Sequence, residues 1–308
     1  MSNTPTIAAL YVILLPWGIL WLLLLDRYRE RGAIIPTEPR RLVPWNGFPH
    51  VALAFFIYIA LQWLWANLIR HSFDLGVDDS LVDMPEVFAW LLAGNAVLIL
   101  LSIGLIFTFL RIDLRATLAD LGVQFGKIKS DIALGLVAFL AAAPLVYILN
   151  YILKQAYEIV VEEKAAHPIE KMMLDNPSTG VLFWAFCTAV IAAPLVEEFL
   201  FRVILQGWLE KAFIRTKRFA AAQAAGEEVT EEQLTSQSPD TTFMWQPIVL
   251  SSITFALPHA GHGPDPVPLF FLAMVLGYLY AKTHRILPGI VVHMALNGTS
   301  MLILMTGL

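Results

Sequence analysis

The sequence predicts an all-α, polytopic integral membrane protein, a helical bundle of about eight transmembrane helices. Hydrophobic residues make up 58% of its 308 residues and charged residues only 15%. An ordinary soluble domain has about 45–50% apolar and about 25% charged residues. The charges are also missing from eight long intervals of the chain. Because a backbone inside a bilayer must satisfy its own hydrogen bonds, we expect each interval to be helical.

Composition excludes other classes of protein. Cys187 is the only cysteine, so a disulfide framework is excluded. The formal net charge of −5 argues against a basic surface that binds nucleic acid, and no nucleic-acid partner is expected. The bilayer itself is the partner that the composition predicts.

The charge-free intervals place the spans. A helix needs about 20 apolar residues to cross a hydrocarbon core of about 30 Å. The sixth and seventh candidates are short, so either they tilt into a protein-lined cavity or one of them does not cross fully. We expect spans at about 6–26, 48–69, 87–110, 132–153, 179–200, 245–259, 267–282 and 286–305.

The distribution of basic residues predicts the orientation. The first span lacks a basic leader and is followed directly by Arg27, Arg29 and Arg31, which favours an uncleaved span over a signal peptide. The odd-numbered connections hold most of the Lys and Arg residues, and such connections face the cytoplasm. We therefore expect both termini outside the cytoplasm, in a multi-pass protein of the plasma (inner) membrane.

The first polar cluster lies in the fifth span and contains Glu197, Glu198 and Arg202. A charge at bilayer depth is costly, so such residues are functional candidates. Glu198 and Arg202 are four residues apart and can pair on one helix face. Glu197 points about 100° away from that face and lacks this partner. The alternative is a helix end in the headgroup region, where all three charges are solvated. Outside this cluster, we expect nearly all of the charge to lie in the connections, where it sets the topology.

Two further clusters follow. His259 ends the sixth segment beside Pro258, and the alternative is an ordinary interfacial histidine. His293 and Asn297 are four residues apart in the last segment and share one face, although they could simply bond two spans together. Together, the three clusters suit amide hydrolysis without a Ser or Cys nucleophile. A carboxylate with histidine can activate water, and an asparagine amide can stabilise an oxyanion.

These three clusters, in this order on apolar segments, resemble the CPBP family, which comprises CAAX prenyl endopeptidases and bacteriocin-processing or abortive-infection proteins. The family signature is EExxxR, FxxxH and HxxxN, and the matching residues lie between about 180 and 305. All three motifs match in full, at Glu197-Glu198 with Arg202, Phe255 with His259, and His293 with Asn297.

The resemblance implies a membrane-embedded endopeptidase of the glutamic type. It implies Glu197 as the general base, assisted by His259, with His293 holding the water or substrate and Asn297 stabilising the oxyanion. Glu198 and Arg202 would support the site, which would open toward the cytoplasm. The implied substrate is a peptide or a lipidated, CAAX-like protein. The implied organisation is N-terminal spans of unknown role at 1–110, then a protease core at 111–308. The small, polar and acidic composition of 220–242 predicts a flexible cytoplasmic loop within this core.

Three alternatives stay open at this point. Glu with two His could bind zinc, but the HExxH pattern is absent and the sequence favours chemistry without a metal or other cofactor. Some members of the family act in bacteriocin immunity or as scaffolds, without hydrolysis. A transporter with a polar relay is disfavoured because the polar residues are confined to the last four segments.

Overall fold

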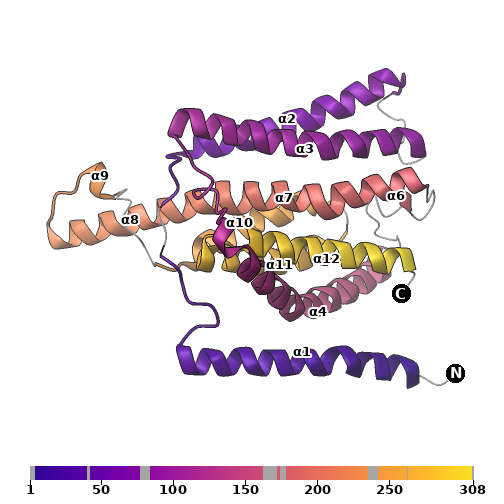
Figure 1. The fold of residues 1–308 in the computed structure, drawn as a ribbon, viewed down its shortest axis with the longest axis horizontal. Coiled ribbons are helices and arrows are strands. Elements are labelled where there is room, and N and C mark those ends of the chain that lie inside the picture. The colour runs from indigo at the N-terminus through magenta and orange to yellow at the C-terminus, as the bar shows by residue number, and fades with distance from the viewer. Residues whose placement is uncertain are drawn as a thin grey trace.

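The computed structural model describes residues 4–39, 42–76, 84–161, 172–173, 178–234, 242–261 and 263–306. Within these ranges the chain is helical and contains no strand. Figure 1 shows the long helices running roughly along one direction. The N-terminal half contains α1 (Thr4–Arg31), α2 (Phe48–Ser72), α3 (Pro85–Leu114), η2 (Phe125–Lys127) and α4 (Ile128–Val161).

The C-terminal half begins with one continuous helical rod at 179–225. Its segments are α6 (Thr179–Ala185), the π-helix η3 (Phe186–Ala192), α7 (Ala193–Glu197), the π-helix η4 (Glu198–Gln206) and α8 (Gly207–Ala225). The short α9 (Glu231–Leu234) follows. The chain then forms α10 (Trp245–Ala256), η5 (Leu257–His259), α11 (Pro266–Thr283) and α12 (Leu287–Thr306).

Six helical segments in the described ranges are long and apolar enough to cross a membrane. The predicted all-helical membrane bundle is confirmed, but the expected count of eight spans is not. The sixth predicted span corresponds to α10, whose 12 residues cover only about 18 Å. The segments of sufficient length are Phe48–Ser72, Pro85–Leu114, Phe125–Val161, Thr179–Ala225, Pro266–Thr283 and Leu287–Thr306.

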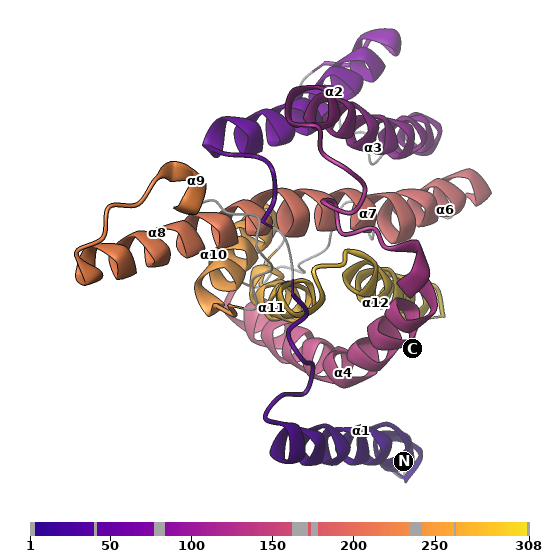
Figure 2. The same cartoon turned by 60° about the vertical axis from the view of Figure 1, so that its left-hand side comes forward.

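The helices form a core with two outlying parts (Figure 2). In the core, α12 packs on α4 and α10 packs on α11. The α2–α3 hairpin packs on the rod, with α3 against α6, η3 and α7 and α2 against η4, and α1 lies against α4. The indoles of Trp17 and Trp21 donate to the Ala141 carbonyl of α4 at 2.8 and 3.1 Å. In the same turn of α4, Pro144 has no N–H to donate to the Leu140 carbonyl, so the regular helical bonding is interrupted there.

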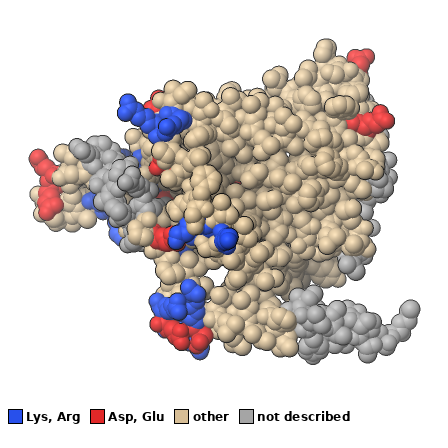
Figure 3. All heavy atoms as spheres, in the orientation of Figure 1, with Lys and Arg blue, Asp and Glu red and all other residues tan. Residues whose placement is uncertain are grey.

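Charge is scarce on the molecular surface. Figure 3 shows a broad face without charged side chains, and most of the coloured side chains gather at the end where α8 and α9 project. Such a surface suits a bilayer, because apolar side chains face lipid without cost. The helices and the surface together support a multi-pass integral membrane protein.

Five charged residues in or at the edges of the predicted connections are buried in the structure rather than solvated. Each has polar partners that offset its desolvation. Lys211 of α8 donates to the Val43 and Trp45 carbonyls at 2.8 and 3.3 Å. The buried charged residues outside the predicted site are Asp131, Glu210, Lys211, Lys282 and Arg285.

The predicted loop at 220–242 is only partly a loop. The helix α8 continues into this stretch as far as Ala225, and Gly226 ends it in the left-handed region at φ 70°. Thr230 and Gln233 form reciprocal bonds at the start of α9, as in a capping box. Residues 235–241 lie outside the described residues.

Candidate active site

Two π-helical segments shape the rod around the predicted carboxylates. Pro194 has no N–H to donate to the carbonyl four residues earlier, so the regular helical bonding is interrupted there. The π-helix η3 ends just before this proline, and η4 begins at Glu198. Single π turns inside helices are frequent at functional sites because they alter the direction of neighbouring side chains. Glu197 and Glu198 lie at the junction of α7 and η4.

Glu198 and Arg202 form the pair that their spacing predicts. Arg202 Nε lies 3.5 Å from Glu198 Oε2, and each side chain is only 1% exposed. His293 Nδ1 lies 3.3 Å from Glu198 Oε1. A Cβ atom at Gly289, one turn earlier in α12, would lie 2.7 Å from Glu198 Oε2. The absence of a side chain at Gly289 therefore makes room for this carboxylate.

Glu197 differs from its neighbour in accessibility. Its Oε2 atom lies 3.5 Å from His293 Nε2, so His293 stands between the two carboxylates. The Glu197 side chain is 23% exposed, whereas that of His293 is 3% exposed. We name Glu197, Glu198, Arg202 and His293 the Glu198 cluster. Within it, Glu197 is the carboxylate that a water molecule can approach.

His259 joins this cluster through an aromatic ring. The Phe255 ring centroid lies 5.6 Å from that of His259 and 5.7 Å from that of His293. His259 Nδ1 lies 3.2 Å from the Phe255 carbonyl, which fits donation from Nδ1 and leaves Nε2 as an acceptor. The Arg202 guanidinium also lies over the Phe255 ring, 5.4 Å from its centroid. The motif phenylalanine thus connects three of the predicted polar residues.

Asn297 lies next to the Glu198 cluster, one turn after His293 in α12, and bonds to η3. Its Nδ2 atom donates to the Ala189 carbonyl of η3 at 2.8 Å. Among the described residues, no hydrogen bond links Asn297 to the Glu198 cluster. It lines a cavity of about 440 Å³ bounded by α4, α6, η3, α11 and α12. The structure therefore brings Glu197, Glu198, Arg202 and His293 into direct contact, His259 beside them, and Asn297 one turn farther along α12.

A buried polar relay behind Arg202 was not identified from the sequence. Arg202 Nη1 donates to Ser251 Oγ, and Ser251 Oγ donates to Gln206 Oε1, each at 3.2 Å. Gln206 Nε2 in turn donates to the Gly277 carbonyl and to Glu210 Oε1, each at 2.9 Å. Gln206 lies four residues after Arg202 in an apolar segment, which is the signal that could have indicated it.

A second ionic cluster holds the start of α12. Arg285 Nε donates to Asp131 Oδ1 at 2.7 Å, and Arg285 Nη1 contacts Glu38. We name Arg285, Asp131 and Glu38 the Arg285 clamp. The clamp joins α4, the α11–α12 turn and the segment that follows α1. None of its members belongs to the predicted site.

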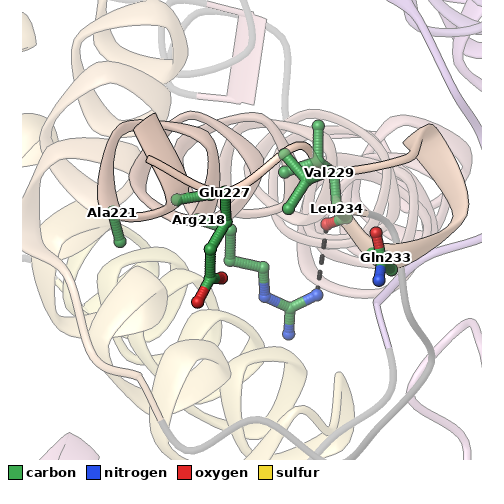
Figure 4. Close-up of a pocket in the computed structure, with 7 residues that line it drawn as sticks. Arg218, Ala221, Glu227, Val229, Gln233 and Leu234 are labelled. Atoms are coloured by element: carbon green, nitrogen blue, oxygen red, sulfur yellow. Dashed lines mark hydrogen bonds between the residues drawn. The ribbon is translucent and has the colours of Figure 1, made fainter. Parts of the chain in front are cut away.

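Another cavity lies away from the predicted residues. It has a volume of about 330 Å³ and lies between the end of α8 and α9. Figure 4 shows Arg218 in this cavity, with its guanidinium donating to the Leu234 carbonyl at 3.1 Å. Its lining contains none of the predicted catalytic residues.

The predicted site residues include side-chain types that can bind a metal ion. In the part of the chain that the structure describes, no group of three or more His, Cys, Asp or Glu side chains is arranged to hold a metal ion. A structural zinc site uses four such ligands, and a catalytic one uses three.

Comparison with protein families identifies the segment that carries the site. Residues 179–299 match the family described as type II CAAX prenyl endopeptidase, Rce1-like. This is a family of proteases, and the match confirms the resemblance indicated by the motifs. No curated protein and no solved structure matches the chain. The Rce1-like segment contains all six predicted site residues, whereas α1 to α4 lie outside it.

Proposed function

We propose that this protein is a membrane-embedded endopeptidase of the glutamic type. It hydrolyses a peptide bond of a membrane-associated or lipidated, CAAX-like protein with water activated by Glu197. The observation that carries the proposal is the contrast between two adjacent carboxylates on either side of one histidine. Glu197 is 23% exposed and Glu198 is 1% exposed. The Rce1-like match supports the reaction class.

The difference in exposure assigns a different role to each carboxylate. Glu198 is enclosed by Arg202, His293 and the bare Gly289 backbone, so it cannot reach a substrate. Glu197 is open and can accept a proton from water, as a general base must. Glu198 therefore acts as a fixed negative charge that orients His293.

His293 is placed to bridge both carboxylates. An imidazole ring donates through both nitrogens only when it is protonated. His293 in that form would donate to Glu198 through Nδ1 and to Glu197 through Nε2. Two carboxylates, one guanidinium and one imidazolium would then have no net charge, which reduces the cost of burying the cluster.

The reaction follows from these positions. Glu197 takes a proton from a water molecule, and the water oxygen bonds to the carbonyl carbon while the carbonyl electron pair moves to oxygen. The second N–H of the Asn297 amide donates to this oxyanion. When the carbonyl re-forms, the C–N bond breaks and protonated Glu197 gives its proton to the leaving nitrogen. His259 orients the water through its Nε2 acceptor.

We place the opening of the site on the cytoplasmic side of the plasma membrane, with both termini on the other side. After Glu197 the rod continues through η4 into α8, which carries four basic residues, Lys211, Arg215, Lys217 and Arg218. Basic residues that flank a span favour the cytoplasm. A substrate presented at that face would reach Glu197 without crossing the bilayer.

The decisive test uses the full-length protein in lipid nanodiscs and a fluorogenic lipidated peptide. Glu197→Gln keeps the shape of the side chain but cannot accept a proton. We expect turnover to fall at least about 10²-fold, because general acid–base catalysis contributes about 10²–10⁴-fold. Glu228→Ala changes an exposed carboxylate of the α8–α9 connection and should keep wild-type turnover.

Further arms of the test separate the alternatives. His259→Ala should also reduce turnover, and wild-type turnover in both variants would refute the proposal. An inactive wild type that confers a protective phenotype independent of Glu197 would instead support an immunity or scaffold role. Activity that a chelator removes and zinc restores would indicate a metal mechanism.

A further inference from the structure

The role of the N-terminal helices is suggested by the α2 face that packs on the active-site helix. Phe55 of α2 contacts Phe201 of η4 edge to face, with ring centroids 5.3 Å apart. Phe201 in turn contacts Phe255, at 5.2 Å. Phe255 is the ring that touches both His259 and His293. A short series of aromatic rings therefore ties α2 to the proposed catalytic residues.

Tyr58 lies one turn after Phe55 and thus on the same face of α2. It is half-buried and packs against the core cluster that contains Val196, Phe201 and Phe255. α2 and the rod run in opposite directions (Figure 1), so the turn after Phe55 on α2 lies level with the turn before Phe201 on the rod, which carries Glu197. An electrostatic effect of Glu197 on Tyr58 agrees with this placement. Tyr58 therefore lies beside the turn of the rod that carries Glu197, which is the more exposed of the two carboxylates.

The Tyr58 hydroxyl has no hydrogen-bond partner among the described residues. A polar group inside a membrane-spanning helix normally forms a hydrogen bond with another helix, because the lipid hydrocarbon provides no hydrogen-bond partner. A tyrosine with an unused hydroxyl beside an accessible carboxylate is therefore a functional candidate.

We propose that the Tyr58 hydroxyl donates a hydrogen bond to the Glu197 carboxylate and holds it toward the attacking water. Tyr58 is then a positioning residue, supplied by a helix that precedes the Rce1-like segment. The inference rests on the proposed function, since Glu197 must be the base. His293 from α12, His259 from η5, and Glu198 and Arg202 from η4 are the other titratable or charged groups that face Glu197.

Tyr58→Phe tests the hydroxyl alone, because the ring and its packing remain. In the full-length protein we expect kcat to fall about 10- to 100-fold, since a hydrogen bond to a charged group is lost. KM should stay within about twofold, because the substrate contacts are unchanged. The acid limb of the pH–rate profile should move to higher pH, since the ionised carboxylate loses a donor.

Two control variants make the test specific. Tyr151→Phe removes the hydroxyl of a tyrosine in α4 that is 67% exposed, and it should behave as wild type. Phe55→Leu weakens the packing of α2 on η4 while it keeps the Tyr58 hydroxyl. It should lower the thermal midpoint but leave the acid limb in place.

The outcomes distinguish this inference from the proposed function. If Tyr58→Phe keeps the kcat and pH profile of Tyr151→Phe while Glu197→Gln is inactive, only the role of Tyr58 is refuted. A loss in Tyr58→Phe that Phe55→Leu reproduces, pH profile included, would show a packing role and would also refute it. Wild-type turnover in Glu197→Gln would overturn the proposed function itself.

Discussion

The two ionic clusters beside the first turns of α12 are built in opposite ways. In the Arg285 clamp, the guanidinium donates at 2.7 Å to Asp131 and also contacts Glu38. In the Glu198 cluster, Arg202 lies 3.5 Å from its carboxylate. Within the described chain, Glu198 Oε2 and Arg202 Nε and Nη2 have no hydrogen-bond partner. Buried polar groups are normally bonded, so incomplete bonding requires an explanation.

The contrast indicates different tasks. A fully bonded ion pair resists rearrangement and fixes the elements that carry it. The clamp joins three segments that are far apart in the sequence, and it supports the start of the helix that presents His293. The Glu198 cluster is bonded loosely, which suits a site where protons and substrate atoms must move. Stability should therefore depend mainly on the clamp, and turnover mainly on the cluster.

The largest expected effect is on stability, from Arg285→Met. This change leaves the Asp131 carboxylate buried without its cation, and removal of one partner of a buried pair costs about 3–5 kcal/mol. Thermal or denaturant unfolding in detergent would measure the loss. The kcat of the folded fraction should stay near wild type, and a variant of normal stability would contradict the assignment of the clamp.

The double variant Glu198→Gln, Arg202→Met reverses this pattern. Replacing both members of a buried pair by neutral groups of similar size is often neutral or stabilising, so the unfolding free energy should change by less than about 1 kcal/mol. His293 loses its fixed charge, and we expect kcat to fall about 10- to 100-fold. If kcat remained at the wild-type level, Glu198 would have only a structural role.

The sequence already indicated the residues of the Glu198 cluster because charge is conspicuous in apolar segments. Their four-residue spacings also predicted which side chains share a face. The spacing of Gln206 from Arg202 could have indicated one member of the buried relay. The π turns, the space at Gly289 and the place of Ser251 in that relay could not be predicted, since they depend on how helices approach one another. Asp131 and Arg285 are 154 positions apart, so only the tertiary structure reveals their pairing.

The number of spans was less predictable than the helical class. A charge-free interval shows which segment can lie in the bilayer. It does not show where the helix in that segment begins and ends. The interval around 245–259 contains Pro258, and the α-helix ends at Ala256 before a short 3₁₀ turn that carries His259. Because the helix ends early, this histidine is partly buried beside Phe255.

Gly289→Ala probes the space that accommodates Glu198. The added Cβ would lie 2.7 Å from Glu198 Oε2, so either the carboxylate or α12 must move. Overpacking of this kind costs about 1–3 kcal/mol, and kcat should fall as Glu198 leaves His293. Gly298→Ala on the same helix is the matched control, because its Cβ meets Val190 at an ordinary 3.5 Å. It should be neutral or slightly stabilising, since Ala favours a helix; equal effects of the two changes would refute the argument.

The smallest expected effect is a difference in stability between variants of two adjacent serines in α10. Ser251 accepts from Arg202 and donates to Gln206, whereas the buried hydroxyl of Ser252 has no partner in the described residues. Ser251→Ala should destabilise the fold by about 1 kcal/mol, the usual worth of such a bond, and lower kcat slightly because Arg202 is less firmly held. Ser252→Ala should be neutral or stabilising, because an unpaired buried hydroxyl only costs free energy. Unfolding measurements on the two variants decide between them, and a larger loss from Ser252→Ala would mean that the relay does not support Arg202.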